Sequence, residues 1–248
     1  LAVAAALERE GADLLLHTGD IVYPSMVAGR FDLRFFSMYE PLLRRLPWFT
    51  TLGNHDIDST DAAYVEAFHL PTNRVTGTEH YYSFDHGEVH FVSLCIPWFG
   101  GSPFTPARTV EGPNAALRWL EEDLAGTTRP WKVVFFHQPG RTSGPHAWDD
   151  YNLDGTRDVE QVRATLLPVL AQHGVQLVFM GHDHDWERFA PEQGVNWVVT
   201  GGGGAELYGI WQRDPWSLRF LSRYHFVRVR VDSERAAVTC VATDGAVL

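Results

Sequence analysis

Cysteine, lysine and long apolar runs are scarce in this protein, and each shortage excludes a class of structure. The chain has 248 residues but only two cysteines, Cys95 and Cys240, which are too few for a disulfide-rich scaffold. Both cysteines lie in apolar, strand-like runs, where buried free thiols are favoured over a disulfide. No run reaches the about 20 apolar residues that a membrane-spanning helix needs, so no membrane span is expected.

Positive charge is also in short supply, because Lys132 is the only lysine and the formal net charge is -11. A protein that covers nucleic acid broadly needs a basic face, so this composition argues against a nucleic-acid footprint. It does not exclude a substrate that carries phosphate, because bound cations can dominate the electrostatic field of a site.

Strands and helices alternate over most of the chain, and antiparallel strands follow. Apolar runs and alternating patterns predict strands at 13–17, 47–52, 81–84, 89–93, 132–136, 175–180, 195–200, 226–231 and 236–243. Helical periodicity predicts helices at 1–10, 33–46, 61–69, 114–124 and 158–173, with breaks at Pro41 and Pro168. We therefore expect a single α/β domain over residues 1–248, with two mixed sheets packed face to face and helices outside.

Four short motifs each follow a predicted apolar strand and place oxygen or imidazole donors in the turn after it. They span residues 19–23 (GDIVY), 53–56 (GNHD), 134–137 (VFFH) and 181–184 (GHDH). In an α/β sheet the functional site lies at the carboxyl ends of the strands, so these turns are expected to meet. One such turn is commonplace, but four in this order indicate the site of a two-metal hydrolase.

The first motif offers a carboxylate and a phenol. Asp20 is placed to bridge two cations, although a Gly-Asp pair alone is more often a turn or a helix N-cap. Tyr23 is a poor ligand for most divalent ions, but as a phenolate it suits Fe(III). The alternative for Tyr23 is a packed aromatic side chain.

The second motif offers an amide oxygen, an imidazole and a carboxylate in successive residues. Asn54 would give its amide oxygen to a metal, and His55 would then face the substrate. Asp56 would orient the His55 ring from outside the ligand set. The alternative is a simple Asn-His turn, which is less specific than this motif after a strand.

The remaining motifs supply three histidines. His137 ends an apolar strand and gains its significance from the other motifs. His182 and His184 are two residues apart, a spacing that points side chains in divergent directions and suits two different metals. His146 lies in a polar, Gly-rich segment at 141–154, where it would either face the site or be an exposed loop histidine.

These four motifs resemble those of the calcineurin-like metallophosphoesterases. Tyr23, three residues after Asp20, and the segment at 185–188 (DWER) resemble the purple acid phosphatase branch of that family. The resemblance spans residues 13–188, and the glycine run at 201–204 is also familiar in bacterial members. It implies a four-layer α/β/β/α sandwich.

The resemblance also implies two metal ions, Fe(III) together with Fe(II), Zn(II) or Mn(II). The ligands implied for Fe(III) are Asp20, Tyr23 and His184. The ligands implied for the divalent ion are Asp20 as a bridge, Asn54, His137 and His182. His55 would contact the phosphate or protonate the leaving group, and His146 would bind substrate.

One motif of the family has no counterpart in this sequence. The family's first motif, Asp-x-Gly or Asp-x-His, follows the first strand, supplies another ferric ligand and precedes the helix that leads to Gly-Asp. Here that helix is where the sequence starts. Either the sequence is a fragment of a longer chain or the ferric site lacks one ligand. We expect the former, a domain that lacks its N-terminal first strand.

The implied activity is hydrolysis of a small-molecule phosphoester by a hydroxide that two metal ions activate. An acid phosphatase acting on monoesters is expected first, and a phosphodiesterase of the same family is the alternative. A non-catalytic binding or scaffold domain is the alternative of another class; the missing carboxylate supports it, and six remaining ligand candidates oppose it. Family analogy suggests a secreted or periplasmic protein. The oligomeric state stays open.

Overall fold

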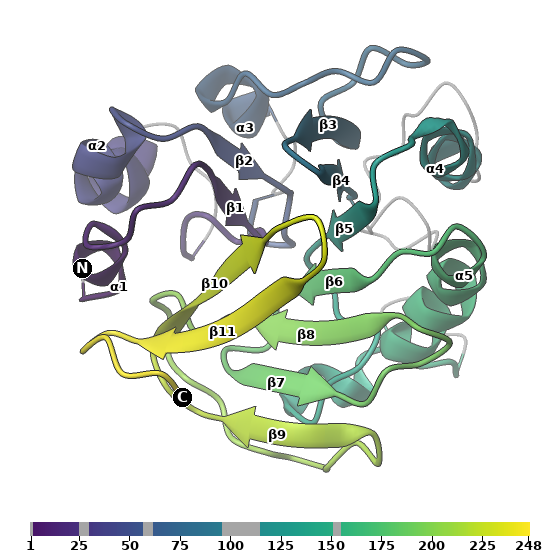
Figure 1. Ribbon diagram of the computed structural model, residues 1–248. Coiled ribbons are helices and arrows are strands. Elements are labelled where there is room, and N and C mark those ends of the chain that lie inside the picture. The colour runs from purple at the N-terminus through teal and green to yellow at the C-terminus, as the bar shows by residue number, and fades with distance from the viewer. Residues whose placement is uncertain (1, 25–29, 57–61, 96–114, 151–154) are drawn as a thin grey trace.

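The computed structural model describes residues 2–24, 30–56, 62–95, 115–150 and 155–248 (Figure 1). A seven-stranded mixed sheet forms the centre of this described part, in the order β3-β4-β5-β6-β8-β7-β9. Its strands are β3 (Tyr82–His86), β4 (Val89–Ser93), β5 (Trp131–Phe135), β6 (Leu177–Met180), β8 (Asn196–Thr200), β7 (Trp186–Phe189) and β9 (Ser217–Leu221). The central strands β4, β5, β6 and β8 run parallel, and antiparallel strands complete both edges.

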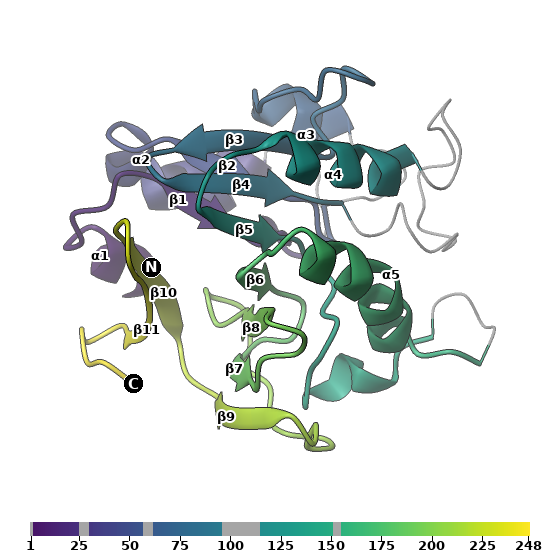
Figure 2. The same cartoon turned by 45° about the vertical axis from the view of Figure 1, so that its right-hand side comes forward.

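Two short ladders form a second β layer. In the first, β1 (Leu15–His17) pairs in parallel with β2 (Trp48–Thr50). In the second, β10 (His225–Val231) pairs antiparallel with β11 (Ala236–Ala242). Figure 2 shows β10 and β11 on one side of the large sheet, and the helices α4 (Ala115–Gly126) and α5 (Asp158–Gln172) on the other.

Alternate side chains of β5 enter two different cores. Val134 packs with Leu120 of α4 and Leu166 of α5 on the helix side of the sheet. Phe135 packs with Leu52 and Cys240 between the sheet and the second β layer. Successive side chains of a strand point to opposite faces, so a strand buried on both faces must be apolar throughout, and β6 is buried at every position.

Further helices cover the outer side of the second β layer. They are α1 (Ala2–Leu7), the π-helical turn η1 (Asp32–Phe36), α2 (Ser37–Leu43) and α3 (Ala62–Ala67). Phe35 and Tyr39 make ring contacts with Trp48 of β2, at centroid distances of 5.3 and 4.9 Å. Figure 1 places α1 and α2 on the far side of β1 and β2 from α4 and α5. The predicted sandwich of two β layers flanked by helices is confirmed.

Two predicted helix breaks are wrong. Pro168 lies inside α5, which continues to Gln172, and Pro41 lies inside α2. A proline inside a helix removes one hydrogen bond, a cost that burial of apolar neighbours offsets. In α5 those neighbours are Leu166, Leu167 and Leu170, which are all buried.

Two strands of the large sheet were not predicted from sequence. β7 contains the charged residues Glu187 and Arg188, which break any apolar run. β9 carries no continuous apolar run and is mostly half-buried or exposed. Both strands form because they complete the edge of the sheet beyond β8. None of the helices in the described ranges is long and apolar enough to span a membrane.

Candidate metal centre

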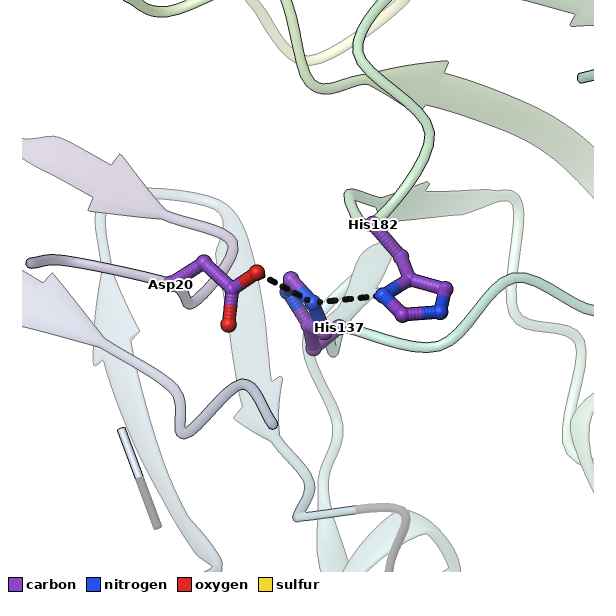
Figure 3. Close-up of side chains that lie close together, drawn as sticks. All are labelled: Asp20, His137 and His182. Carbon is purple, nitrogen blue, oxygen red and sulfur yellow. Dashed lines mark hydrogen bonds and ion pairs between the residues drawn. The ribbon is translucent and has the colours of Figure 1, made fainter. Parts of the chain in front are cut away.

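The carboxyl ends of four strands bring the predicted ligands to one place. The segments after β1 and β2 carry Asp20 and Asn54, and those after β5 and β6 carry His137 and His182. Because β1 pairs in parallel with β2, and β5 with β6, the turns after each pair leave at the same edge. Figure 3 shows Asp20, His137 and His182 converging, with the His137 ring between the other two.

Asp20 occupies the centre of the group. Its Oδ2 lies 3.2 Å from His137 Nε2 and accepts a hydrogen bond from Tyr23 Oη at 2.8 Å. Its Oδ1 accepts the backbone N–H of His55 at 2.9 Å. The backbone of Asp20 has φ of +54°, a left-handed conformation that an Asp side chain tolerates and that aims the carboxylate inward. Asp20 Oδ2 therefore faces two sets of side chains. The first set is Asn54, His137 and His182, and the second set is Tyr23 and His184.

In the first set, ring nitrogens and an amide oxygen converge around His137 Nε2. His137 Nδ1 donates to the carbonyl oxygen of Thr18 at 2.7 Å, so the lone pair of the neutral ring is on Nε2. That Nε2 lies 3.1 Å from His182 Nδ1 and 3.1 Å from Asn54 Oδ1. The ligand atoms of Asp20, His137 and His182 all lie within 4.8 Å of one another. Acceptors that converge in this way fit a bound cation.

The second set lies on the other side of Asp20. Tyr23 Oη is 2.9 Å from His184 Nε2. His184 Nδ1 donates to the carbonyl oxygen of Glu206 at 2.6 Å, which leaves its Nε2 lone pair directed at the phenol. The ring of Tyr208 stacks on His184 at a centroid distance of 4.2 Å. Burial first, and then the Asp20 charge, raise the pKa of Tyr23, so only a strongly acidic cation would hold it as a phenolate.

His182 and His184 point into different sets, as expected, but not because of their spacing, since residues two apart in an extended strand share a face. His182 has φ of +70°, so the segment is not extended at this point. His182 Nδ1 meets His137, whereas His184 Nε2 meets Tyr23. Burial lowers the pKa of His182 to about 3 and also lowers that of His184. Both rings are therefore neutral at physiological pH and keep a lone pair for a metal. Binding of metal by these six side chains stays a prediction.

His55 lies at the rim of the site, half-buried, with its ring 4.5 Å from that of Tyr23. Its Nδ1 donates to the carbonyl oxygen of Pro24 at 2.5 Å. The expectation that Asp56 orients this ring is corrected, because the fully buried Asp56 accepts the N–H groups of Ile21 and Gly53 at 2.8 and 2.9 Å. Asp56 instead ties the Asp20 turn to the Asn54 turn, and burial, followed by Asp20, raises its pKa to about 7.

His146 joins the site beside His182. The two rings lie 3.8 Å apart, and Tyr208 is 5.8 Å from His146 on another side. His146 Nδ1 donates to Asp149 Oδ2 at 2.6 Å. Burial lowers the pKa of His146, but this hydrogen bond and the negative charges of Asp183 and Asp149 together outweigh burial, so the pKa is raised overall. Of the two readings that the sequence left open, the structure favours the one in which His146 faces the site.

Three groups that support the site were not found from sequence. The carbonyl oxygens of Thr18 and Glu206 fix the tautomers of His137 and His184, and backbone carbonyls leave no mark in a sequence. Asp149 is the third, and its position three residues after His146 is a signal that was available.

Residues 1–186 match the family model of calcineurin-like phosphoesterases. Purple acid phosphatase 21 of Arabidopsis thaliana is 29% identical over 232 residues, which cover 86% of this chain and 47% of that protein. Tartrate-resistant acid phosphatase type 5 of Homo sapiens is 28% identical over 225 residues, covering 81% of this chain and 64% of that protein.

A solved structure has the same fold over nearly the whole chain. It is a purple acid phosphatase isolated from yellow lupin (Lupinus luteus) seeds, with a TM-score of 0.77 and 22% identity. The match covers 99% of this chain and 47% of the lupin chain. This chain thus spans about half the length of several relatives that it matches. On the family match and the geometry of the site, the chain belongs to the calcineurin-like phosphoesterase family.

Proposed function

We propose that this chain carries the catalytic site of a metal-dependent phosphoester hydrolase, an acid phosphatase that acts on monoesters. One observation carries the proposal: Asp20 Oδ2 lies between the His137–His182 pair and the Tyr23–His184 pair. A carboxylate oxygen between two groups of side chains that can bind metal is able to bridge two ions, which supports a dinuclear site.

The two sets differ in chemistry, which supports two different metals. Phenol and carboxylate oxygens with one imidazole suit Fe(III), and the residues proposed to hold it are Asp20, Tyr23 and His184. Two imidazoles with an amide and a carboxylate oxygen suit Fe(II), Zn(II) or Mn(II), and the proposed residues are Asp20, Asn54, His137 and His182. When bound, the two ions would lower the pKa of water and neutralise charge on the phosphate oxygens.

His55 is proposed to protonate the leaving group. A carbonyl oxygen only accepts, so the contact with Pro24 places a proton on Nδ1. In the imidazolium form Nε2 carries a second proton, and this is the proton that His55 would give to the departing alkoxide, which leaves a neutral ring. His146, whose raised pKa favours the imidazolium form, is proposed to bind a phosphate oxygen from the opposite side of His182. The similarity to acid phosphatases supports the choice of monoesters.

Elemental analysis of the purified protein, followed by paired assays, tests the proposal. We expect about two metal ions per chain, one of them iron, and faster hydrolysis of a monoester than of a diester with the same leaving group. Two metals without iron would contradict the Tyr23 assignment, and a faster diester reaction would replace the monoesterase by a phosphodiesterase. A protein that holds no metal after reconstitution would overturn the proposal in favour of a non-catalytic domain.

A further inference from the structure

Asp149 lies beside two histidines of the site, outside both proposed ligand sets. It directly follows the short 3-10 helix η3 (Pro145–Trp148), and its own N–H donates to the carbonyl oxygen of His146 at 3.3 Å. Side chains three residues apart eclipse one another in a 3-10 turn, so this backbone puts the Asp149 carboxylate on the same side as the His146 ring. The carbonyl oxygen of Asp149 accepts the N–H of Asp158 at 2.7 Å, which anchors the position to α5.

One oxygen of this carboxylate contacts both histidines. Asp149 Oδ2 lies 2.6 Å from His146 Nδ1 and 3.4 Å from His182 Nε2. An ionised carboxylate only accepts, so both ring nitrogens carry hydrogen. In neutral His182 the lone pair is then on Nδ1, the nitrogen that faces His137. A hydrogen bond to the outer nitrogen of a ligating histidine fixes its tautomer and ring orientation.

The same three side chains approach the geometry of a separate metal site, because their ligand atoms lie within 4.8 Å of one another. His182 decides against that reading. A neutral imidazole has one ring lone pair, so His182 can bind a metal in only one of the two groups, and the proposed divalent site takes it on the His137 side. A hydrogen-bonded bridge therefore accounts for the contacts, and it leaves Nδ1 of His182 available to the proposed divalent ion.

The segment just before His146 is fixed by contacts with β7 and with the residues that precede it. Ser143 gives its Oγ–H and its N–H to the buried Glu187 of β7, at 2.5 and 2.8 Å. Gly144 packs so closely on Asp183 that an added Cβ would overlap the carboxylate. His146 and Asp149 thus start from a backbone fixed to the strand that follows the two histidine ligands.

We propose that Asp149 is a positioning residue that couples substrate binding to the metal site. Through His146 it holds the ring that binds phosphate, and through His182 it keeps Nδ1 directed at the divalent ion. This inference rests on the proposed function for the role of His146, but its contacts with His182 stand without it.

Two affinities test the coupling without relying on turnover. For Asp149→Ala we expect the affinity for zinc, measured by competition with a chelator, to fall about tenfold. The affinity of the zinc-loaded protein for inorganic phosphate, measured by calorimetry, should fall by about the same factor. Asp150→Asn is the matched control, since it removes a neighbouring charge whose carboxylate accepts Gly155 N–H, and it should leave both affinities unchanged. Asp149→Asn keeps the side-chain volume and one acceptor oxygen. If the alanine variant folds poorly, the same two affinities are compared between Asp149→Asn and Asp150→Asn.

A double-mutant cycle with His146→Ala separates the effect of Asp149 on phosphate binding, through His146, from its effect on zinc binding, through His182. If Asp149 acts on substrate through His146, its replacement should weaken phosphate binding little once His146 is gone, while the loss of zinc affinity persists. With an active enzyme, KM for a monoester should rise in Asp149→Ala more than kcat falls.

A wild-type protein that binds zinc and phosphate but hydrolyses no ester would refute the proposed function and leave the positioning role intact. Affinities of Asp149→Ala equal to those of Asp150→Asn, or loss of a third zinc ion from Asp149→Ala, would overturn the inference.

Discussion

Tyr23 and His184 are 161 positions apart in the chain, and the phenol oxygen of the first lies 2.9 Å from Nε2 of the second. The same phenol donates to Asp20 at 2.8 Å, so it is held between an acceptor nitrogen and an acceptor oxygen. This placement brings a phenol, a carboxylate and an imidazole together. Such a group selects for a hard, highly charged cation.

Replacing Tyr23 by Phe should abolish this selectivity. We expect Tyr23→Phe to lose the visible absorption band of an iron(III)–phenolate and to bind less iron relative to zinc, because no phenolate remains to meet the ferric ion. The measurement is an absorption spectrum with elemental analysis. Tyr208→Phe is the control, since it keeps the ring that stacks on His184 and should keep the colour. A coloured Tyr23→Phe protein would contradict the assignment.

Replacing His55 should separate metal binding from turnover. His55→Ala is expected to retain both metals and to lose about 10²- to 10⁴-fold in kcat on an alkyl phosphate, because the departing alkoxide loses its proton donor. An aryl phosphate with an acidic leaving group needs less protonation, so its rate should fall far less. Equal losses on the two substrates would remove His55 from this role.

The contact between Gly53 and Asp20 predicts an intolerant position. A Cβ at residue 53 would overlap Asp20 Oδ1, the oxygen that accepts the His55 N–H. Gly53→Ala should therefore displace the central carboxylate and weaken zinc binding by more than about tenfold. Gly203→Ala is the control, because nothing lies within 4 Å of a Cβ at that position. Unchanged zinc affinity in Gly53→Ala would show that Asp20 is not the bridge.

The positions of the main site residues can be predicted from the sequence by one rule. Asp20, His137 and His182 each come after a short apolar strand, and parallel strands deliver their carboxyl ends to one edge. The partner of Asp56 could not be found this way. Its hydrogen bonds to Ile21 and Gly53 depend on how two turns lie across one another, which is set by packing between β1 and β2.

The course of the backbone was predictable where local patterns dominate and not where tertiary contacts override them. The β3–β4 hairpin follows from alternating residues around Gly87, whose φ of +55° suits a tight turn. Pro168 signals a break that burial of Leu166 and Leu170 overrules. β7 is a strand because β8 and β9 pair with it on either side, and its own sequence gives no such signal.

Away from the metal site, His90 of β4 lies between two carboxylates. Its Nδ1 is 2.7 Å from Asp85 Oδ1, and its Nε2 is 2.8 Å from Asp123 Oδ2. Arg129 donates to the other oxygen of Asp85, and Ser83 donates to the other oxygen of Asp123. Burial lowers the pKa of His90, but the hydrogen bonds to Asp123 and Asp85 outweigh it, so the pKa is raised overall.

This network predicts a stability that depends on pH. Because the folded pKa of His90 exceeds the ordinary histidine value of 6.5, its stabilisation is complete below pH 6.5 and is lost as the pH rises through the folded pKa. His90→Gln should lower the free energy of unfolding by about 2 kcal/mol near pH 6 and by less near pH 9. Urea unfolding across this range measures it. An equal loss of stability at the two ends of this pH range would contradict the prediction.

Each proposed ion takes ligands from both β layers. Asp20, Tyr23 and Asn54 extend from the layer of β1 and β2, while His137, His182 and His184 extend from the seven-stranded sheet. The interlayer core, which includes Leu52 and Phe135, therefore works as a spacer that fixes how far apart the opposing donors stand. Protein interiors are close-packed and hardly compressible. The distance between the ligands of each set therefore depends on how the hydrophobic core between the two layers is packed. A methylene gained or lost there would change the spacing between the proposed ligands without a change in any ligand itself.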